Sequence, residues 1–145
     1  MAFTYEYPRM LVTVDAIVFL KDTTNNYKVL LIERKNDPFK GQYALPGGFV
    51  DMNETLKDAA TRELYEETGL KGVELHQLFA FDSIDRDPRG RNLCVAFYGF
   101  TLPNNSSVTA SDDAEKAQWF DINNLPELAF DHKKIIHLAI NKIES

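Results

Sequence analysis

The sequence predicts an α/β fold, or α+β in a looser description, with a mixed β-sheet flanked by helices. Apolar and β-branched runs of strand length recur along the chain, and two stretches show helical periodicity. No repeat or Gly/Ser-rich linker divides the 145 residues, of which 44% are hydrophobic and 26% charged. These values are typical of a soluble globular protein, so we expect a single domain over residues 1–145.

The expected elements follow from local composition. Strands are expected at residues 10–20, 27–34, 73–81, 92–102 and 116–120, where β-branched and aromatic residues gather. The first two should form a hairpin, because the polar segment between them is prone to turn. A helix at 55–68 should end at Gly69, which suits a C-terminal cap. A second helix, at 131–143, places Ile135, Leu138, Ala139 and Ile143 on one side.

Charge and cysteine content exclude several classes of function. The net charge is −6, which argues against broad binding of nucleic acid in the absence of metal. The single Cys94 excludes an internal disulfide framework and a cysteine-rich zinc site. The sequence shows neither a secretory signal nor the roughly 20 apolar residues that span a bilayer, so a cytoplasmic protein without membrane contact is expected.

The helix at 55–68 carries acids where a structural helix would be apolar. Leu56, Ala60 and Leu64 form one stripe, and Glu63 and Glu67 fall inside it. The ordinary interpretation of such a charge run is a solvated face paired to a neighbouring arginine. Carboxylates inside an apolar stripe instead need a positive partner, because burying them alone is costly. A hard divalent cation such as Mg²⁺ or Mn²⁺ suits this group.

The segment before this helix adds a further candidate ligand. Gly47 and Gly48 allow close approach of the backbone to a ligand or ion, although two glycines also suit a simple turn. A free carbonyl there could join the metal shell. Glu54 lies near the positive end of the helix, where a carboxylate is favoured in any case.

These residues closely resemble the motif of the Nudix hydrolase family. That motif is Gly, five residues, Glu, seven residues, then Arg-Glu-aliphatic-any-Glu-Glu-any-Gly-aliphatic. The chain has Gly48, Glu54 and then the run Arg62-Glu63-Leu64-Tyr65-Glu66-Glu67-Thr68-Gly69-Leu70, so every specified position matches. The resemblance extends more loosely from the first strand through Trp119.

The resemblance implies an α/β/α sandwich around a mixed sheet and metal-dependent hydrolysis of a nucleoside diphosphate derivative. Mg²⁺ is the implied cofactor, with Mn²⁺ as a substitute. By position, Glu63, Glu66 and Glu67 correspond to metal ligands, with the Gly48 carbonyl as an addition. Arg62 corresponds to the residue that orients these carboxylates, and Glu54 to a structural residue.

A carboxylate must also accept the proton of the attacking water. Within the motif, Glu63 and Glu67 are the candidates. On a later acidic loop, Asp113 is the best placed by its distance from Trp119. A solvated turn explains that loop equally well, so the general base stays open.

Two further segments resemble the ADP-ribose-directed branch of the family, and the closing run Phe130-Asp131-His132 is similar to that branch too, where His132 could contact ligand although capping or core packing is the simpler interpretation. One is the loop that carries Arg86, Arg89 and Arg91, whose guanidinium groups suit phosphate oxygens, although local Arg–Asp pairing is the simpler interpretation. The other runs from Pro38 to Phe49 and contains Phe39 and Tyr43, which are candidates for stacking on adenine. The implied reaction converts ADP-ribose, or a related nucleotide sugar, to AMP and a sugar phosphate.

Other functions remain open at this point. One is a nucleoside triphosphate pyrophosphohydrolase that sanitises nucleotides. Another is a non-catalytic domain that senses ADP-ribose, although a complete acidic motif fits catalysis better. Family members of this size often form homodimers, and the alternating aromatics Phe3, Tyr5 and Tyr7 are a candidate contact.

The acidic charge is concentrated in the motif. Residues 48–70 hold six acids and two bases, so this segment carries −4 of the net charge of −6. Bound cations would reverse the local sign and admit a small pyrophosphate substrate.

Overall fold

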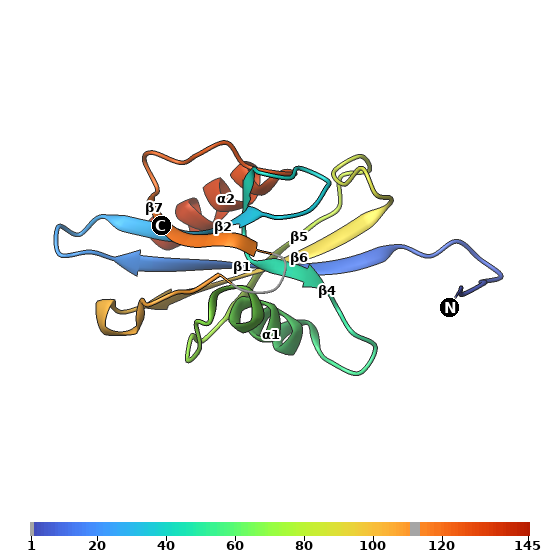
Figure 1. Ribbon diagram of the computed structural model, residues 1–145, viewed down its shortest axis with the longest axis horizontal. Coiled ribbons are helices and arrows are strands. Elements are labelled where there is room, and N and C mark those ends of the chain that lie inside the picture. The colour runs from blue at the N-terminus through green and yellow to red at the C-terminus, as the bar shows by residue number, and fades with distance from the viewer. Residues whose placement is uncertain (1, 111–113) are drawn as a thin grey trace.

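A mixed sheet lies between two helices, as the sequence predicts (Figure 1). The computed structural model describes residues 2–110 and 114–145. Within them the strand order is β3-β2-β1-β6-β5, with β4 paired to β1 and β7 paired to β2. The β1–β6 pair is parallel and the other pairs are antiparallel. The prediction of an α/β/α arrangement around a mixed sheet is therefore confirmed.

The long strands and both helices lie where the sequence predicts them, within a few residues. Two short strands, β3 and β4, and the 3₁₀ turn η1 were not predicted. The element bounds are β1 Leu11–Lys21, β2 Tyr27–Arg34, β3 Tyr43–Ala44, β4 Gly47–Phe49, α1 Leu56–Thr68, β5 His76–Phe81, β6 Asn92–Thr101, η1 Pro103–Asn105, β7 Ala114–Asp121 and α2 His132–Glu144.

Strand β1 is the centre of the core, because its side chains alternate between the two faces of the sheet. Val14, Ala16 and Val18 belong to the apolar cluster that contains the buried residues of α1. Ile17 and Phe19 belong to the cluster that contains the buried residues of α2. Figure 1 shows the two helices on opposite sides of the strands. One strand thus anchors both helices.

Helix α1 is held at both ends by its own sequence. The Thr55 side chain accepts a hydrogen bond from the Asp58 amide, which caps the first turn. Gly69 has φ +74°, and its amide donates to the Tyr65 carbonyl. A left-handed glycine of this kind ends the helix, as predicted. These caps fix the length and position of the helix that carries the acidic motif.

Strand β4 brings Gly47 and Gly48 against the centre of the sheet. Gly47 pairs with Asp15 and Gly48 pairs with Val14 of β1. A Cβ at Gly47 would lie 2.2 Å from both Asp15 Oδ1 and the Val14 carbonyl oxygen, so a side chain does not fit. The two glycines therefore form more than a simple turn.

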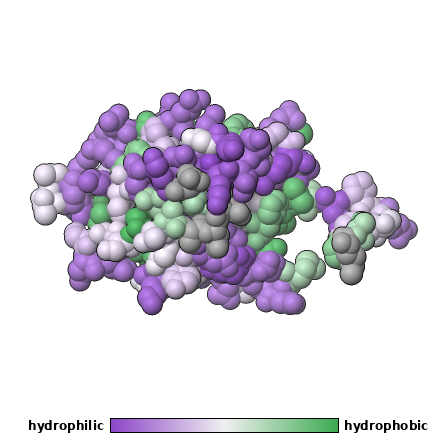
Figure 2. Space-filling view, viewed as in Figure 1, coloured by the Kyte–Doolittle hydropathy of each residue, from purple (hydrophilic) through white to green (hydrophobic). Residues whose placement is uncertain are grey.

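Residues 2–10 project from the body as an extended tail (Figure 2). Phe3 and Tyr7 are 73% and 72% exposed, so these rings contribute little to the core. The homodimer contact expected at this tail stays a prediction. Among the described helices, none has both the length and the apolar character needed to cross a bilayer.

Candidate metal and nucleotide site

A pocket of about 390 Å³ opens where β1, β4 and α1 meet the loop between β5 and β6. This size lies in the range of roughly 300–1,000 Å³ that is usual for small-molecule sites. Charged side chains of both signs surround it, which suits a polyanionic ligand with its counter-cations. Its lining residues are Thr13, Asp15, Ile32, Arg34, Asn36, Asp37, Leu45, Gly47, Gly48, Phe49, Asp51, Arg62, Glu63, Glu66, Glu67, Arg86, Asp87, Arg89, Asn92, Phe130 and His132.

Glu67 is the most buried acid of the motif. It is only 6% exposed and lies on the face of α1 that packs on the sheet. Its Oε1 accepts a hydrogen bond of 2.7 Å from the Gly47 amide. Burial raises the pKa of Glu67 to about 8, the nearby Glu63 and Asp15 carboxylates add to this rise, and the Gly47 hydrogen bond opposes it. The charge of Arg34 also opposes the rise but does not outweigh burial, so the ionised carboxylate is not fully compensated.

Arg62 holds the other acids of the motif in place. Its Nη1 donates to Glu63 Oε1 at 2.8 Å and to Glu66 Oε2 at 3.2 Å. Its Nη2 and Nε donate to the two carboxylate oxygens of Glu54, at 2.6 and 3.0 Å. Hydrogen bonds from Arg62 lower the pKa of Glu54 to about 2. This geometry agrees with an orienting role for Arg62 and a structural role for Glu54.

Gly48 is needed where Glu63 approaches the backbone. A Cβ at Gly48 would lie 2.7 Å from the Glu63 carboxyl carbon and from its Oε2. The backbone of β4 thus lies directly against a carboxylate of α1. Burial raises the pKa of Glu63 despite its bond to Arg62. Both Glu63 and Glu67 are therefore destabilised as anions in the same pocket.

The donor set fits a hard divalent cation, although the carboxylates are not gathered around one point. Within residues 2–110 and 114–145, no three His, Cys, Asp or Glu side chains form a ready-made metal cluster. Glu63 and Glu66 contact Arg62, and Glu67 contacts Gly47. All three nevertheless line one pocket beside Gly48, and oxygen donors are those that Mg²⁺ and Mn²⁺ prefer.

The three arginines predicted to bind substrate have different surroundings. The Arg86 side chain is 3% exposed, and its Nε and Nη2 donate to Asp131 at 3.0 and 2.6 Å. Arg89 lines the pocket and is more exposed, at 35% of its side chain. Arg91 donates to the Asp82 carbonyl and is not among the described residues that line the pocket. Only Arg89 combines exposure with a place in the pocket wall.

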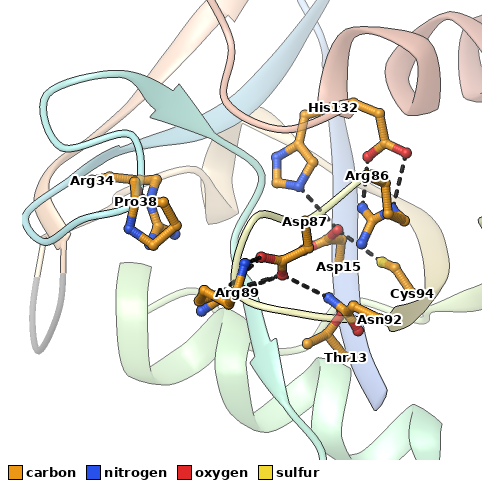
Figure 3. Close-up of polar contacts among 11 residues, drawn as sticks. Thr13, Asp15, Arg34, Pro38, Arg86, Asp87, Arg89, Asn92, Cys94 and His132 are labelled. Atoms are coloured by element: carbon orange, nitrogen blue, oxygen red, sulfur yellow. Dashed lines mark hydrogen bonds and ion pairs between the residues drawn. The ribbon is translucent and has the colours of Figure 1, made fainter. Parts of the chain in front are cut away.

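A buried chain of hydrogen bonds holds Arg89 towards the pocket (Figure 3). Asp87 accepts from Arg89 Nε at 3.0 Å and from Nη2 at 2.7 Å, and its own side chain is fully buried. Asn92 donates to Asp87 and accepts from Thr13 of β1. Burial alone would raise the pKa of Asp87, but the bonds from Arg89 and Asn92 lower it to about 2. The guanidinium is thus fixed by an ionised partner.

Arg34, Phe49 and Phe130 also line the pocket near Arg89. Phe49 and Phe130 lie in segments that resemble the ADP-ribose-directed branch, whereas Arg34 was not predicted. The Arg89 guanidinium carbon lies 4.9 Å from the centre of the Phe49 ring and 5.4 Å from that of Phe130. Arg34 lies 5.1 Å from the centre of Phe130, and its Nε donates to the Pro38 carbonyl. Cation–π contacts of this kind order guanidinium groups beside a ligand site. An arginine at the end of an apolar strand was the only sequence signal for Arg34.

The two aromatics predicted to stack on adenine pack against other rings of the protein. The Phe39 ring packs edge-on against Phe130, with ring centres 4.7 Å apart. Tyr43 packs in the same way against Phe120, at 4.9 Å. Neither is among the described residues that line the pocket. The predicted general base Asp113 lies outside the described residues.

Three comparisons with known proteins agree on the family. A family model described as NUDIX domain matches residues 11–139. An ADP-ribose pyrophosphatase from Methanocaldococcus jannaschii is 48% identical over 125 residues, which cover 86% of this chain and 70% of that protein. The ADPR responsive transcriptional repressor NtrR from Acinetobacter baylyi is 34% identical over 145 residues, which cover 97% of this chain and 57% of the repressor.

Solved structures confirm the fold over nearly the whole chain. The NUDIX domain of Shewanella oneidensis NrtR, complexed with ADP ribose, matches with a TM-score of 0.88 and 30% identity, covering 94% of this chain and 90% of that one. A MutT/nudix family protein from Enterococcus faecalis also has a TM-score of 0.88, with 33% identity over 99% of this chain and 65% of its own. The resemblance seen in the acidic motif is therefore confirmed.

The raised pKa of Glu67 predicts a pH dependence of stability in metal-free protein. Between about pH 4.5 and 8 the folded state keeps a proton on Glu67 that the unfolded state releases. The free energy of unfolding should therefore fall as pH rises through this window, and the Glu67→Gln variant should lack this part of the slope. Urea unfolding in a chelator from pH 5 to 8 measures both slopes. Equal slopes for the wild type and the Glu67→Gln variant would contradict a raised pKa of Glu67 in the folded protein.

Proposed function

The chain belongs to the Nudix hydrolase family, and we propose that it hydrolyses the pyrophosphate linkage of ADP-ribose with the help of a divalent cation. The observation that carries the proposal is the buried Glu67 beside Glu63 and Gly48, in a pocket that also holds Arg89. Such a pocket offers a cation site next to a guanidinium. A diphosphate with its counter-cation is complementary to both charges.

The choice of ADP-ribose is supported by the relatives and by the pocket. One relative is named an ADP-ribose pyrophosphatase, and one structural neighbour is a NUDIX domain complexed with ADP ribose. In this chain, the guanidinium carbons of Arg34 and Arg89 lie 5.1 and 5.4 Å from the centre of the Phe130 ring, and both arginines line the pocket that holds the acids of α1. We expect these guanidinium groups to bind the phosphate that lies farther from the cation.

The residues of the pocket divide the chemistry between them. A divalent cation, Mg²⁺ or Mn²⁺, supplies neutralisation of the phosphate oxygens and acidification of water. Glu63, Glu66, Glu67 and the Gly48 carbonyl are the proposed ligands. Arg62 keeps the carboxylates of Glu63 and Glu66 oriented through its hydrogen bonds. Gly47 does the same for Glu67.

The reaction itself is a displacement at phosphorus. The oxygen of water forms a bond to one phosphorus as the bond from that phosphorus to the bridging oxygen breaks. The water proton passes to a carboxylate, for which Glu63, Glu67 and Asp113 are the candidates. The negative charge that develops on the bridging oxygen is stabilised by Arg89, which Asp87 holds in place. The products are AMP and ribose phosphate.

Two other functions have support from particular relatives. An oxidized purine nucleoside triphosphate hydrolase from Danio rerio is 33% identical over 99 residues. The match to the repressor NtrR supports a domain that binds ADP-ribose without cleaving it. Product analysis separates the three, because ADP-ribose hydrolysis releases AMP, triphosphate hydrolysis releases pyrophosphate, and a sensor releases neither.

Replacing Glu67 by Gln should abolish catalysis without unfolding the protein. The amide retains an oxygen for the Gly47 bond but removes the negative charge from the metal site. We expect turnover of ADP-ribose in Mg²⁺ to fall by more than about 100-fold, the upper end of losses for residues that only support metal ligands. The matched control is Asp58→Asn, an exposed acid of the same helix, which should stay within about 2-fold of the wild type. Near-normal turnover of Glu67→Gln would contradict the metal assignment.

Replacing Arg89 by Lys should weaken substrate binding more than it slows turnover. Lysine keeps the charge but loses the paired bonds to Asp87 and the planar contact with Phe49 and Phe130. We expect KM for ADP-ribose to rise about 10-fold, which corresponds to about 1.4 kcal/mol. Arg91→Lys, measured beside it, should change KM by less than about 2-fold. If Arg91→Lys had the larger effect, Arg91 and not Arg89 would bind the substrate.

A further inference from the structure

A buried polar cluster adjoins the metal site, because Asp15 of β1 and His132 of α2 line the same pocket as the acids of α1. Asp15 of β1 is 7% exposed and His132, the first residue of α2, is 4% exposed. Asp15 Oδ2 lies 3.2 Å from His132 Nε2 and accepts from Cys94 Sγ at 2.9 Å. Figure 3 shows the His132 ring and the Cys94 sulfur directed at the same carboxylate. An acid in this strand is conspicuous, because its neighbours on the same face, Ile17 and Phe19, are apolar.

The surroundings of His132 determine which ring nitrogen carries the proton. The Leu45 amide donates to His132 Nδ1 at 3.0 Å. An amide can only donate, so Nδ1 is an acceptor and is unprotonated. The proton of the neutral ring is then on Nε2, where it can be donated to Asp15. Burial and the neighbouring Asp15 raise the pKa of the Cys94 thiol, so this group is also a donor to Asp15.

Leu45 is the first residue of a short segment that leads to the metal site. Pro46 has no backbone N–H to donate, and its carbonyl accepts a hydrogen bond from the Ala16 amide at 2.8 Å. The next amide, that of Gly47, donates to Glu67. Gly47 also lies so close to Asp15 that no side chain fits between them. The backbone from Leu45 to Gly47 is thus held by His132, by β1 and by the buried acid of α1 in turn.

An ion pair next to the cluster also fixes the start of α2. Arg86 forms its paired bonds with Asp131, which directly precedes His132. This ion pair joins the loop between β5 and β6 to the start of α2. The start of α2 is therefore held by two contacts, the part-buried pair of Arg86 and Asp131 and the buried pair of Asp15 and His132. This rigidity is what a side chain needs if it is to position another group.

We propose that His132 is a positioning residue of the metal site. As the Nε2–H tautomer it bridges Asp15 and the Leu45 amide, and so holds the Gly47–Gly48 backbone against Glu67 and Glu63. Although His132 lines the pocket, both of its ring nitrogens are engaged by Leu45 and Asp15, so its proposed role is to orient the ligands of the cation. The inference rests on the proposed function only through the cation site, because it does not depend on which nucleotide is cleaved. Supporting residues behind metal ligands commonly change affinity by about 10–100-fold.

The tautomer can be tested on the metal-free wild-type protein. Two-bond ¹H–¹⁵N correlation spectra distinguish a protonated from an unprotonated ring nitrogen in each histidine. We expect His132 to show an unprotonated Nδ1 and a protonated Nε2. The opposite tautomer, or a ring protonated on both nitrogens at neutral pH, would overturn the inference.

Two substitutions separate the two bonds of the ring. In His132→Asn the side-chain oxygen falls near the position of Nδ1, so the acceptor for Leu45 is kept and the donor to Asp15 is lost. In His132→Gln the longer amide reaches the position of Nε2, so the donor is kept and the acceptor is lost. We expect the Kd for Mn²⁺, measured by calorimetry without substrate, to rise about 10-fold in His132→Gln and less than about 3-fold in His132→Asn.

Equal losses in both variants, or a larger loss in His132→Asn, would overturn the positioning role through Leu45. If His132→Gln does not fold, the tautomer spectrum and the Mn²⁺ affinity of His132→Asn still test the positioning role of His132. A wild-type protein that binds no Mn²⁺ would overturn both this inference and the proposed function. Normal Mn²⁺ binding without hydrolysis of ADP-ribose would overturn only the proposed substrate.

Discussion

The buried carboxylate of Glu67 is the interaction on which the site depends. A helix that packs on a sheet normally presents apolar side chains there, and Ala60 and Leu64 of α1 do so. Glu67 occupies the same face, where burial raises its pKa to about 8. The Gly47 hydrogen bond offsets part of this cost, and a divalent cation would offset more. The fold thus keeps a carboxylate where it is stable as an anion only with a positive partner.

The glycines of β4 and the arginine of α1 follow from this constraint. Gly47 and Gly48 have no side chains, so the strand can approach both Asp15 and Glu63. Arg62 binds Glu54, Glu63 and Glu66 and so prevents the other acids from repelling one another freely. The acids of α1 can therefore lie close to the backbone of β4 because the strand has no side chains there and because Arg62 binds three of the carboxylates. In the proposed function, a bound cation would reverse the sign of the local charge, and the acidic pocket would then accept a pyrophosphate.

Much of this could be predicted from sequence because it is local. The capped helix, the acids inside its apolar stripe and the long strands depend on residues a few positions apart. The role of Asp15 could not be predicted, since His132 and Cys94 lie 117 and 79 residues away in the chain. Likewise, Arg86, Arg89 and Arg91 look equivalent in sequence, and only the buried partners Asp131 and Asp87 distinguish them. The packing of Phe39 against Phe130 and of Tyr43 against Phe120 joins residues 91 and 77 positions apart, so it could not be predicted either.

We propose that the acids of α1 and the Gly48 carbonyl together form one cation site. Anomalous diffraction from crystals grown with Mn²⁺ can locate this site, because the signal places the ion without reference to activity. We expect a peak between the carboxylates of Glu63, Glu66 and Glu67, beside the Gly48 carbonyl. A fully occupied Mn²⁺ peak elsewhere in the molecule, with Glu67 still bonded only to the Gly47 amide, would contradict it.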